Sequence, residues 1–248
     1  MGNTLNDPVY RHDYLPKNGT ELPPAWHQAY FPPRVTEQEL SADGYEQDWK
    51  PPSPFTHRMW AGGELEWNVD NPLRVGDRVE MVSSLRDIQF RPAGRRGDSV
   101  FIWIDKKISN QKGWAMTETR SWVYVQPTSS SPDKNGSSSS KKTQAIFELP
   151  HHDFSFEITP TPITLFRFSA LTFNSHLIHY DHQYATETEH HRVIQSFKYR
   201  CRSPLVVNEA IRVQGKADPD TPGQYSLWVA DAQGNMAVKG TATVATTS

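Results

Sequence analysis

The chain has almost no cysteine: Cys201 is the one thiol in 248 residues. This excludes an internal disulfide framework and most thiolate metal sites, and it is typical of a reducing compartment. Cys201 lies in the stretch FKYRCRSPL, which reads as a strand. We expect a buried or half-buried small side chain there, because a reactive thiol needs an electropositive cleft and a neighbouring base.

Long hydrophobic runs and an excess of one charge are also missing. No run approaches the roughly 18 apolar residues of a membrane helix. The opening residues show neither a signal sequence nor an Arg-rich presequence, and Asn6 stands where myristoylation needs Ser or Thr. With 26 Lys and Arg against 28 Asp and Glu, no basic face is predicted. We therefore expect a cytoplasmic protein without a nucleic-acid or membrane partner.

Motifs for cofactors and metals are absent as well. The sequence has no glycine-rich phosphate loop, no dinucleotide fingerprint and no Gly-x-Ser-x-Gly elbow. His57, His151 and His152 lie near predicted turns, and no spacing identifies a further metal ligand beside them. We therefore expect no cofactor and no metal.

A tract rich in Ser and Lys divides the chain into halves of similar size. Residues 127–144 offer no apolar surface to bury that could offset the entropy of ordering them, which predicts a flexible linker. It separates an N-terminal half, residues 1–126, from a C-terminal half, residues 145–248. The length of the chain also suits two domains.

Both halves are rich in predicted strands. In the first half, residues 78–91, 98–108 and 114–126 alternate in polarity between Gly-containing turns, as antiparallel strands do. Upstream, Thr36 and Glu39 form a capping box for a short helix. The proline-containing first 25 residues are expected to wrap the surface.

In the second half, Thr161 and Pro162 provide an N-cap and a first helical position, and apolar residues then recur at helical spacing. Four strands follow this helix, over residues 196–205, 209–217, 224–232 and 236–244. The expected fold class is thus α+β, with two strongly curved antiparallel sheets.

A polar cluster follows the predicted helix. Asn174, His176 and His179 come in close succession, with Tyr180 and Asp181 directly after them. An imidazole can exchange a proton near neutral pH, and an amide can orient water or a carbonyl, so the cluster can be a reactive site. The alternative is that both histidines only cap the helix and bond local carbonyls.

Four stretches resemble one family. LFRFSALTFNSHLIHYDHQYA, FTHRMWAGGELEW, LPPAWHQAYFPP and FKYRCRSPLVVNEAIRV are similar to segments of the MaoC-like double hot-dog dehydratases and hydratases, which include mesaconyl-C4-CoA hydratase and fungal 3-hydroxyacyl-thioester dehydratase. The resemblance spans most of the chain and implies a double hot-dog fold and a lyase that acts on acyl thioesters. It also allows a mitochondrial location.

The resemblance assigns roles to the polar cluster. Related hydratases carry Asp-x-Asn-Pro-x-His in the working loop, so that His179 falls on the catalytic histidine, Asn174 on the aspartate and His176 on the asparagine. An amide cannot take a proton, which leaves the acid and base work to His179, with Asn174 orienting water or thioester. His176 would support the loop, and Arg167 and Asp181 would hold it by ion pairing.

A second departure from the family concerns the central helix of the second hot-dog. Relatives have a long helix before the strand that matches FKYRCRSP, whereas this chain has only HHRVIQS, too few residues for four or five turns. Three explanations stay open. The second hot-dog is incomplete in this sequence, another segment such as the N-terminal arm fills it, or the pocket is reshaped for a different substrate.

The first-half motif adds candidate substrate contacts. Arg58 and Trp60 stand beside Gly62 and Gly63, and paired glycines allow the backbone to approach a ligand closely. They equally allow a bend in a curled strand. The eight tryptophans of the chain are expected to serve mainly in the core.

The sequence therefore predicts a hydro-lyase that hydrates an enoyl thioester or dehydrates a 3-hydroxyacyl thioester, in a setting suited to fungal specialised metabolism. The expected partners are an acyl-CoA or carrier-protein thioester, or a small polyketide- or terpenoid-like substrate, and a second copy of the chain in a homodimer. Two alternatives stay open: an isomerase or cyclase with a repurposed cavity, and a non-catalytic hot-dog subunit that stabilises a partner.

Overall fold

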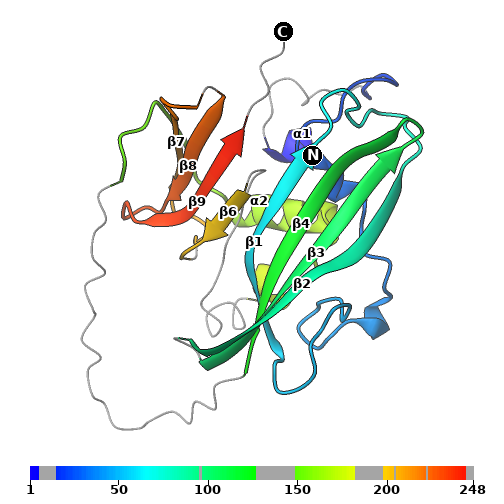
Figure 1. Cartoon of the computed structure of the whole chain (residues 1–248), viewed down its shortest axis with the longest axis vertical. Helices are drawn as coiled ribbons and strands as arrows, with labels where there is room; N and C mark the ends of the chain where they lie inside the picture. Colours follow the sequence, from blue (N-terminus) through cyan, green and yellow to red (C-terminus); the bar gives the residue numbers. More distant parts are fainter. Residues whose placement is uncertain are drawn as a thin grey trace.

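Nine antiparallel strands form one sheet in the computed structural model, which describes residues 1–5, 15–94, 97–126, 149–181, 198–203, 205–221 and 223–243 (Figure 1). The order across the sheet is β2-β3-β4-β1-β6-β9-β8-β7-β5. The strands are β1 (His57–Trp67), β2 (Glu80–Gly94), β3 (Gly97–Asn110), β4 (Gly113–Val125), β5 (Phe154–Ile158), β6 (Lys198–Cys201), β7 (Ile211–Ala217), β8 (Gln224–Ala230) and β9 (Met236–Thr243).

The two halves of the chain meet where β1 pairs with β6. Gly62 lies opposite Arg200 and Gly63 opposite Tyr199, and these are the two residue pairs of that junction. The prediction of two separate sheets is therefore wrong in the number of sheets. The physical reason is that the edge of β1 offers unpaired backbone groups, which a strand of the other half can satisfy.

The predicted strands of both halves are confirmed in their positions. The β3 and β4 strands form a long hairpin that runs from the pair Ser99–Val125 to the pair Asn110–Gly113. Gly113 has a φ of 110°, which favours glycine at the end of this turn. The strand β5 at the sheet edge was not predicted.

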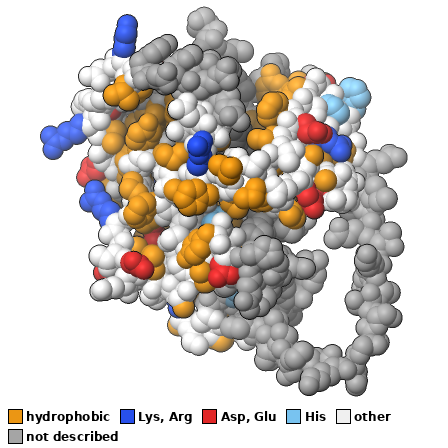
Figure 2. Space-filling model, turned by 180° about the vertical axis from the view of Figure 1, so that it is seen from behind, with side chains coloured by type: hydrophobic (Ala, Val, Ile, Leu, Met, Phe, Trp, Pro, Cys, Tyr) orange, Lys and Arg blue, Asp and Glu red, His pale blue; other side chains and the backbone are white. Residues whose placement is uncertain are grey.

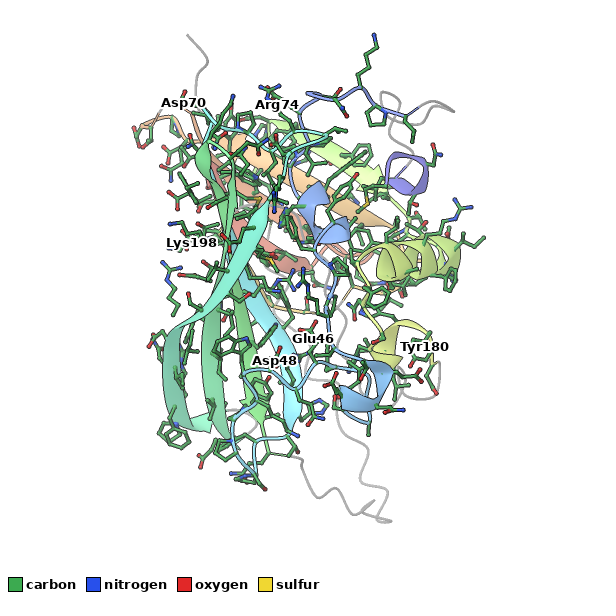
Figure 3. All side chains as sticks on the ribbon, turned by 90° about the vertical axis from the view of Figure 1, so that its right-hand side faces the viewer. Glu46, Asp48, Asp70, Arg74, Tyr180 and Lys198 are labelled. Atoms are coloured by element: carbon green, nitrogen blue, oxygen red, sulfur yellow. The ribbon has the colours of Figure 1, made fainter. Side chains whose placement is uncertain are left out.

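Helical segments are short and lie on one side of the strands in the side view of Figure 3. They are α1 (Gly2–Leu5), α2 (Pro162–Leu171) and the 3-10 turns η1 (Trp26–Ala29), η2 (Glu37–Glu39) and η3 (Leu177–His179). The start of α2 is as predicted, because Thr161 Oγ1 accepts a hydrogen bond from the Thr164 N–H over 3.1 Å and Pro162 follows it. The Thr36–Glu39 capping box is also present, and it begins a single 3-10 turn.

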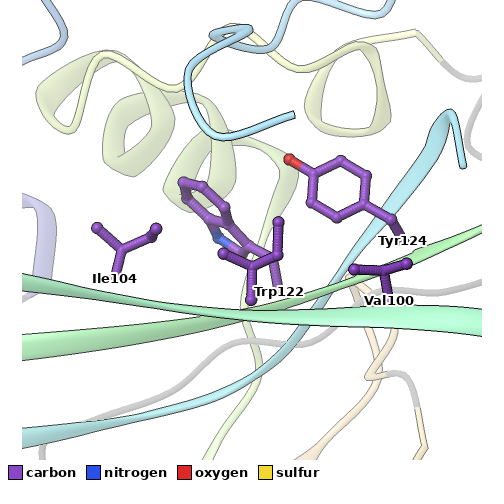
Figure 4. Packing of buried hydrophobic residues seen from close by; sticks show 5 residues of the cluster. Val100, Ile104, Trp122 and Tyr124 are labelled. Carbon is purple, nitrogen blue, oxygen red and sulfur yellow. The ribbon is translucent and has the colours of Figure 1, made fainter. Parts of the chain in front are cut away.

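The core of the first half lies on the face of β3 and β4 that meets these helical segments. Alternate residues of the two strands point to that face, as Figure 4 shows for Val100, Ile104, Trp122 and Tyr124. Each fully buried side chain of this size contributes about 1.5–3 kcal/mol. Further clusters surround Ile108 in the first half and Val238 in the second. Cys201 is buried, as predicted.

Two predicted segments, the linker at 127–144 and the short stretch at 190–196, lie outside the described residues. In the part of the chain that is described, no helix is long and apolar enough to span a membrane.

Hydrophobic side chains form a band across the face seen in Figure 2. Large apolar side chains of α2 are well exposed, with Ile163 at 66% and Phe166 at 67%.

Candidate functional site

The loop that leaves α2 brings Asn174 and His179 together. The side-chain nitrogen Nδ2 of Asn174 lies 3.0 Å from Nε2 of His179. The backbone turns sharply before this pair, at Phe173 with a φ of 54°, and η3 then folds the chain back. The structure thus places the two predicted catalytic residues in direct contact.

Two backbone groups of His176 hold this pair in place. The His176 N–H donates to Oδ1 of Asn174 over 3.3 Å, and the His176 carbonyl accepts from the His179 N–H over 3.0 Å. Since Oδ1 of Asn174 is the acceptor, its NH₂ group faces His179 and donates to Nε2. The neutral His179 ring therefore carries its proton on Nδ1 and presents a basic nitrogen beside an amide donor.

The side chain of His176 is buried between the two halves of the chain. It is 3% exposed, and its ring stacks on Tyr45 with 3.8 Å between ring centroids. Its Nε2 lies 3.5 Å from Oδ2 of Asp43. Burial by itself raises the pKa of Asp43, but hydrogen bonds from His176 and Ser41 outweigh it and hold the pKa well below its usual range. Asp43 is therefore ionised at neutral pH.

Arg58 extends this cluster into the first half. Its guanidinium carbon lies 3.4 Å from the centre of the Tyr45 ring and 4.5 Å from that of Trp122. Since His176 and Arg58 both lie within 4 Å of the centre of one ring, they occupy its opposite faces. Burial raises the pKa of Tyr45, and the Arg58 charge opposes part of that rise.

Two hollows lie beside this stack. The smaller, of about 30 Å³, is lined by Asp43, Tyr45, Arg58 and Tyr124 among others. The larger, of about 370 Å³, is mostly apolar. Its lining consists of Trp49, Lys50, Pro51, Pro52, Phe55, Leu85, Ile88, Val100 and Ile102. Lys50 lines both hollows, so they adjoin, but neither is lined by Asn174 or His179.

The paired glycines of β1, Gly62 and Gly63, lie at the junction of the two halves. Gly62 has a φ of 154° at a bulge, and a Cβ there would lie 2.5 Å from the Tyr199 carbonyl oxygen. A Cβ on Gly63 would lie 2.7 Å from the Thr119 carbonyl oxygen. The space that a side chain would need at these two glycines is therefore occupied by protein backbone.

The other predicted contacts lie apart from the Asn174–His179 pair. Trp60 donates its indole N–H to the Tyr199 hydroxyl over 3.1 Å, across the same junction. Arg167 is exposed on α2, and among the described residues no ion pair joins it to Asp181. That Arg167 and Asp181 hold the loop by ion pairing with other groups stays a prediction. An exposed Arg gains little from such a pair.

A buried charged cluster that contains Glu118, Arg120 and His27 was not predicted from the sequence. Glu118 is 4% exposed and accepts two hydrogen bonds from Arg120, at 2.8 and 3.0 Å. His27, from η1, lies 3.3 Å from the same carboxylate. Burial opposes ionisation of Glu118, but Arg120 and His27 together hold its pKa well below the usual range. Alternation in β4 could have placed Glu118 and Arg120 on the core face with Trp122.

Comparison with solved structures defines the class of protein. The fold is similar to that of a MaoC-like dehydratase from Phytophthora capsici, with a TM-score of 0.55 and 16% identity over 83% of this chain and 80% of the other. HtdX of Mycobacterium tuberculosis gives a TM-score of 0.54 with 14% identity and covers 80% of each chain. The fold is therefore that of MaoC-like dehydratases.

Comparison of sequences gives the family. Residues 25–195 match the family model described as hydroxyacyl-thioester dehydratase type 2, and the chain belongs to that family. It is 31% identical over 232 residues to mesaconyl-C(4)-CoA hydratase of Chloroflexus aurantiacus, covering 83% of this chain and 78% of that protein. It is 25% identical over 244 residues to the mitochondrial hydroxyacyl-thioester dehydratase type 2 of Schizosaccharomyces pombe, covering 78% and 77%.

Proposed function

We propose that the protein is a hydro-lyase that hydrates an enoyl thioester or dehydrates a 3-hydroxyacyl thioester, carried by CoA or a carrier protein. The observation that carries the proposal is the contact between Asn174 and Nε2 of His179, on the loop where the family motif falls. The family and the names of its two relatives support the reaction class. We also propose that each half of the chain is one hot-dog unit.

A single imidazole can carry out both proton steps. In dehydration, the Asn174 N–H leaves Nε2 of His179 as the substrate binds, and the freed lone pair of Nε2 takes the proton from the α-carbon of the substrate. The electron pair forms the carbon–carbon double bond, and the bond to the β-hydroxyl breaks. The imidazolium then returns the same proton to the leaving hydroxyl, which departs as water. Removal of both groups from one face needs only one base, so the lost carboxylate is not required.

Asn174 has a second role in this scheme. Its NH₂ group has two donors, and one of them reaches Nε2 of His179 in the chain without substrate. The other is available to hold the β-hydroxyl oxygen or the attacking water, which fixes the reacting oxygen beside Nε2. Because Oδ1 accepts from the His176 N–H, the amide keeps this orientation.

The larger hollow suits the hydrocarbon part of an acyl group. Its lining is mostly apolar, and its volume of about 370 Å³ lies in the range of small-ligand sites. It adjoins the smaller hollow, which Asp43 and Tyr45 line, and those two residues contact His176. We propose that the acyl chain extends from the Asn174–His179 loop toward this hollow.

The test is an assay of the purified chain with a panel of enoyl thioesters, with mass spectrometry to detect the gain of one water. The wild type is expected to hydrate at least one of them, and His179→Ala to lose about 100-fold or more in rate, as removal of a general base does. His151→Ala is the matched control, since His151 is exposed and contacts His152. Wild-type turnover by His179→Ala would refute the proposal.

A further inference from the structure

A turn of the first half closes directly on the candidate loop of the second. The Leu177 N–H donates to the Asp43 carbonyl over 3.0 Å, and the Ser175 hydroxyl donates to the Gly44 carbonyl over 2.9 Å. Gly44 has a φ of 84°, and a Cβ there would lie 2.1 Å from the Ser175 carbonyl oxygen. Only glycine permits so close an approach.

The carboxylate of Asp43 lies at the centre of this contact. Its Oδ1 accepts from the Ser41 hydroxyl over 2.5 Å, and its Oδ2 lies 3.5 Å from Nε2 of His176. Nδ1 of His176 accepts from the Ile178 N–H over 3.3 Å. The neutral His176 ring therefore carries its proton on Nε2, directed at Asp43.

His176 in turn contacts both members of the candidate pair. Its N–H donates to the Asn174 side chain and its carbonyl accepts from the His179 N–H. A shift of the buried His176 ring would therefore move its backbone and alter the 3.0 Å contact between Asn174 and His179. Neither residue of that pair makes a direct hydrogen bond to Asp43 in the described structure.

We propose that Asp43 is a positioning residue for the reaction: it fixes the ring of His176, which holds Asn174 and Nε2 of His179 at their working distance. This inference rests on the proposed hydro-lyase function. It means that the first half of the chain completes the site of the second, through a residue that acts on Asn174 and His179 by way of His176.

The test is a double-mutant cycle in the full chain with Asp43→Ala and His176→Asn. Asp43→Ala is expected to lower kcat by about tenfold to 100-fold, because a displacement of about 1 Å at a catalytic group can cost that much. KM should change far less, since substrate contacts are kept. In the His176→Asn background, Asp43→Ala should change kcat by less than about twofold, because the residue it acts through is gone.

The matched control is Asp231→Ala, which removes a turn carboxylate that bonds Gln233 and Asn235 between β8 and β9. Ser41→Ala is the milder variant if Asp43→Ala fails to fold, since it leaves the carboxylate and removes one of its hydrogen bonds. Its smaller loss of kcat should also vanish in the His176→Asn background. Equal losses in both backgrounds, or no loss in either, would overturn the proposal.

A second measurement separates this inference from the proposed function. Nitrogen NMR of the His176 ring should show the proton on Nε2 in the wild type, and a changed signal in Asp43→Ala but not in Asp231→Ala. Inactivity of the wild type on every thioester would refute the function, whereas an unchanged His176 signal in Asp43→Ala would refute the positioning role.

Discussion

Trp60 in β1 donates its indole N–H to the hydroxyl of Tyr199 in β6, with 3.1 Å between the two atoms. This hydrogen bond spans the junction at which the two halves form one sheet, beside the pair Gly63–Tyr199. Burial is the main cause that raises the pKa of Tyr199, so the hydroxyl keeps its proton at neutral pH. The halves are thus joined by side chains as well as by the short backbone ladder.

Removal of the Tyr199 hydroxyl should weaken this junction. Tyr199→Phe leaves the Trp60 N–H without its acceptor, and we expect the free energy of unfolding to fall by about 1 kcal/mol. Urea unfolding measures the change. Tyr30→Phe is the control, because Tyr30 is 60% exposed, and it should change stability by less than about 0.5 kcal/mol. Equal values for the two variants would contradict a role of this hydrogen bond.

The same junction shows what the sequence could and could not predict. The positions of the predicted strands and the N-cap of α2 follow from local alternation and from Thr161 and Pro162, whereas the edge strand β5 was not predicted. The pairing of β1 with β6 joins Trp60 and Tyr199 across 139 positions, and local patterns carry no information on it. Likewise, the resemblance predicts roles for Asn174 and His179, but the contacts of Asp43 with the loop depend on the assembled halves.

Gly62 should tolerate no side chain. In Gly62→Ala, the new Cβ would lie 2.5 Å from the Tyr199 carbonyl oxygen, so β1 and β6 must separate. Gly234→Ala is the matched control, since Gly234 has a φ of 83° with open space around it. It should cost about 1–2 kcal/mol from backbone strain alone. Thermal unfolding should show a larger loss for Gly62→Ala, and a smaller one would contradict the close approach of the strands.

Glu118 should be essential to the stability of the first half. Glu118→Gln leaves Arg120 and His27 without their buried anion, and breaking such a pair costs about 3–5 kcal/mol. The control is Glu21→Gln, in the exposed pair with Arg74, where the side chain of Glu21 is 60% exposed. That change should cost less than about 1 kcal/mol. Comparable losses in denaturant unfolding would show that the buried cluster has no special role.

The contribution of Glu118 to the free energy of unfolding should decrease in acid. Its pKa in the folded chain lies well below the ordinary value of 4.5, so the unfolded chain binds more protons between those two values. The contribution is therefore complete above about pH 5.5 and is lost as the pH falls through the folded pKa. The stability difference between wild type and Glu118→Gln should be constant from about pH 8 to 5.5 and narrow below. A stability difference that increases below pH 5.5 would contradict a lowered pKa of Glu118 in the folded chain.

The larger hollow should determine which lengths of acyl chain the protein accepts. Ile88 lines the hollow from β2 and is 54% exposed. The larger side chain in Ile88→Trp should therefore fill part of the hollow without disturbing the core. We expect kcat/KM for long-chain enoyl thioesters to fall by about tenfold to 100-fold, the effect of blocking a few methylenes at about 0.8 kcal/mol each. Short-chain substrates should be turned over as by the wild type.

The control for this change is Val82→Trp. Val82 belongs to the same strand and is similarly exposed, at 55%, but does not line the hollow. Steady-state kinetics over a series of chain lengths should therefore show a change in preference for Ile88→Trp alone. A shared change would indicate a general effect on β2, and an unchanged preference in both would place the acyl chain elsewhere, because a filled hollow cannot accept the same hydrocarbon.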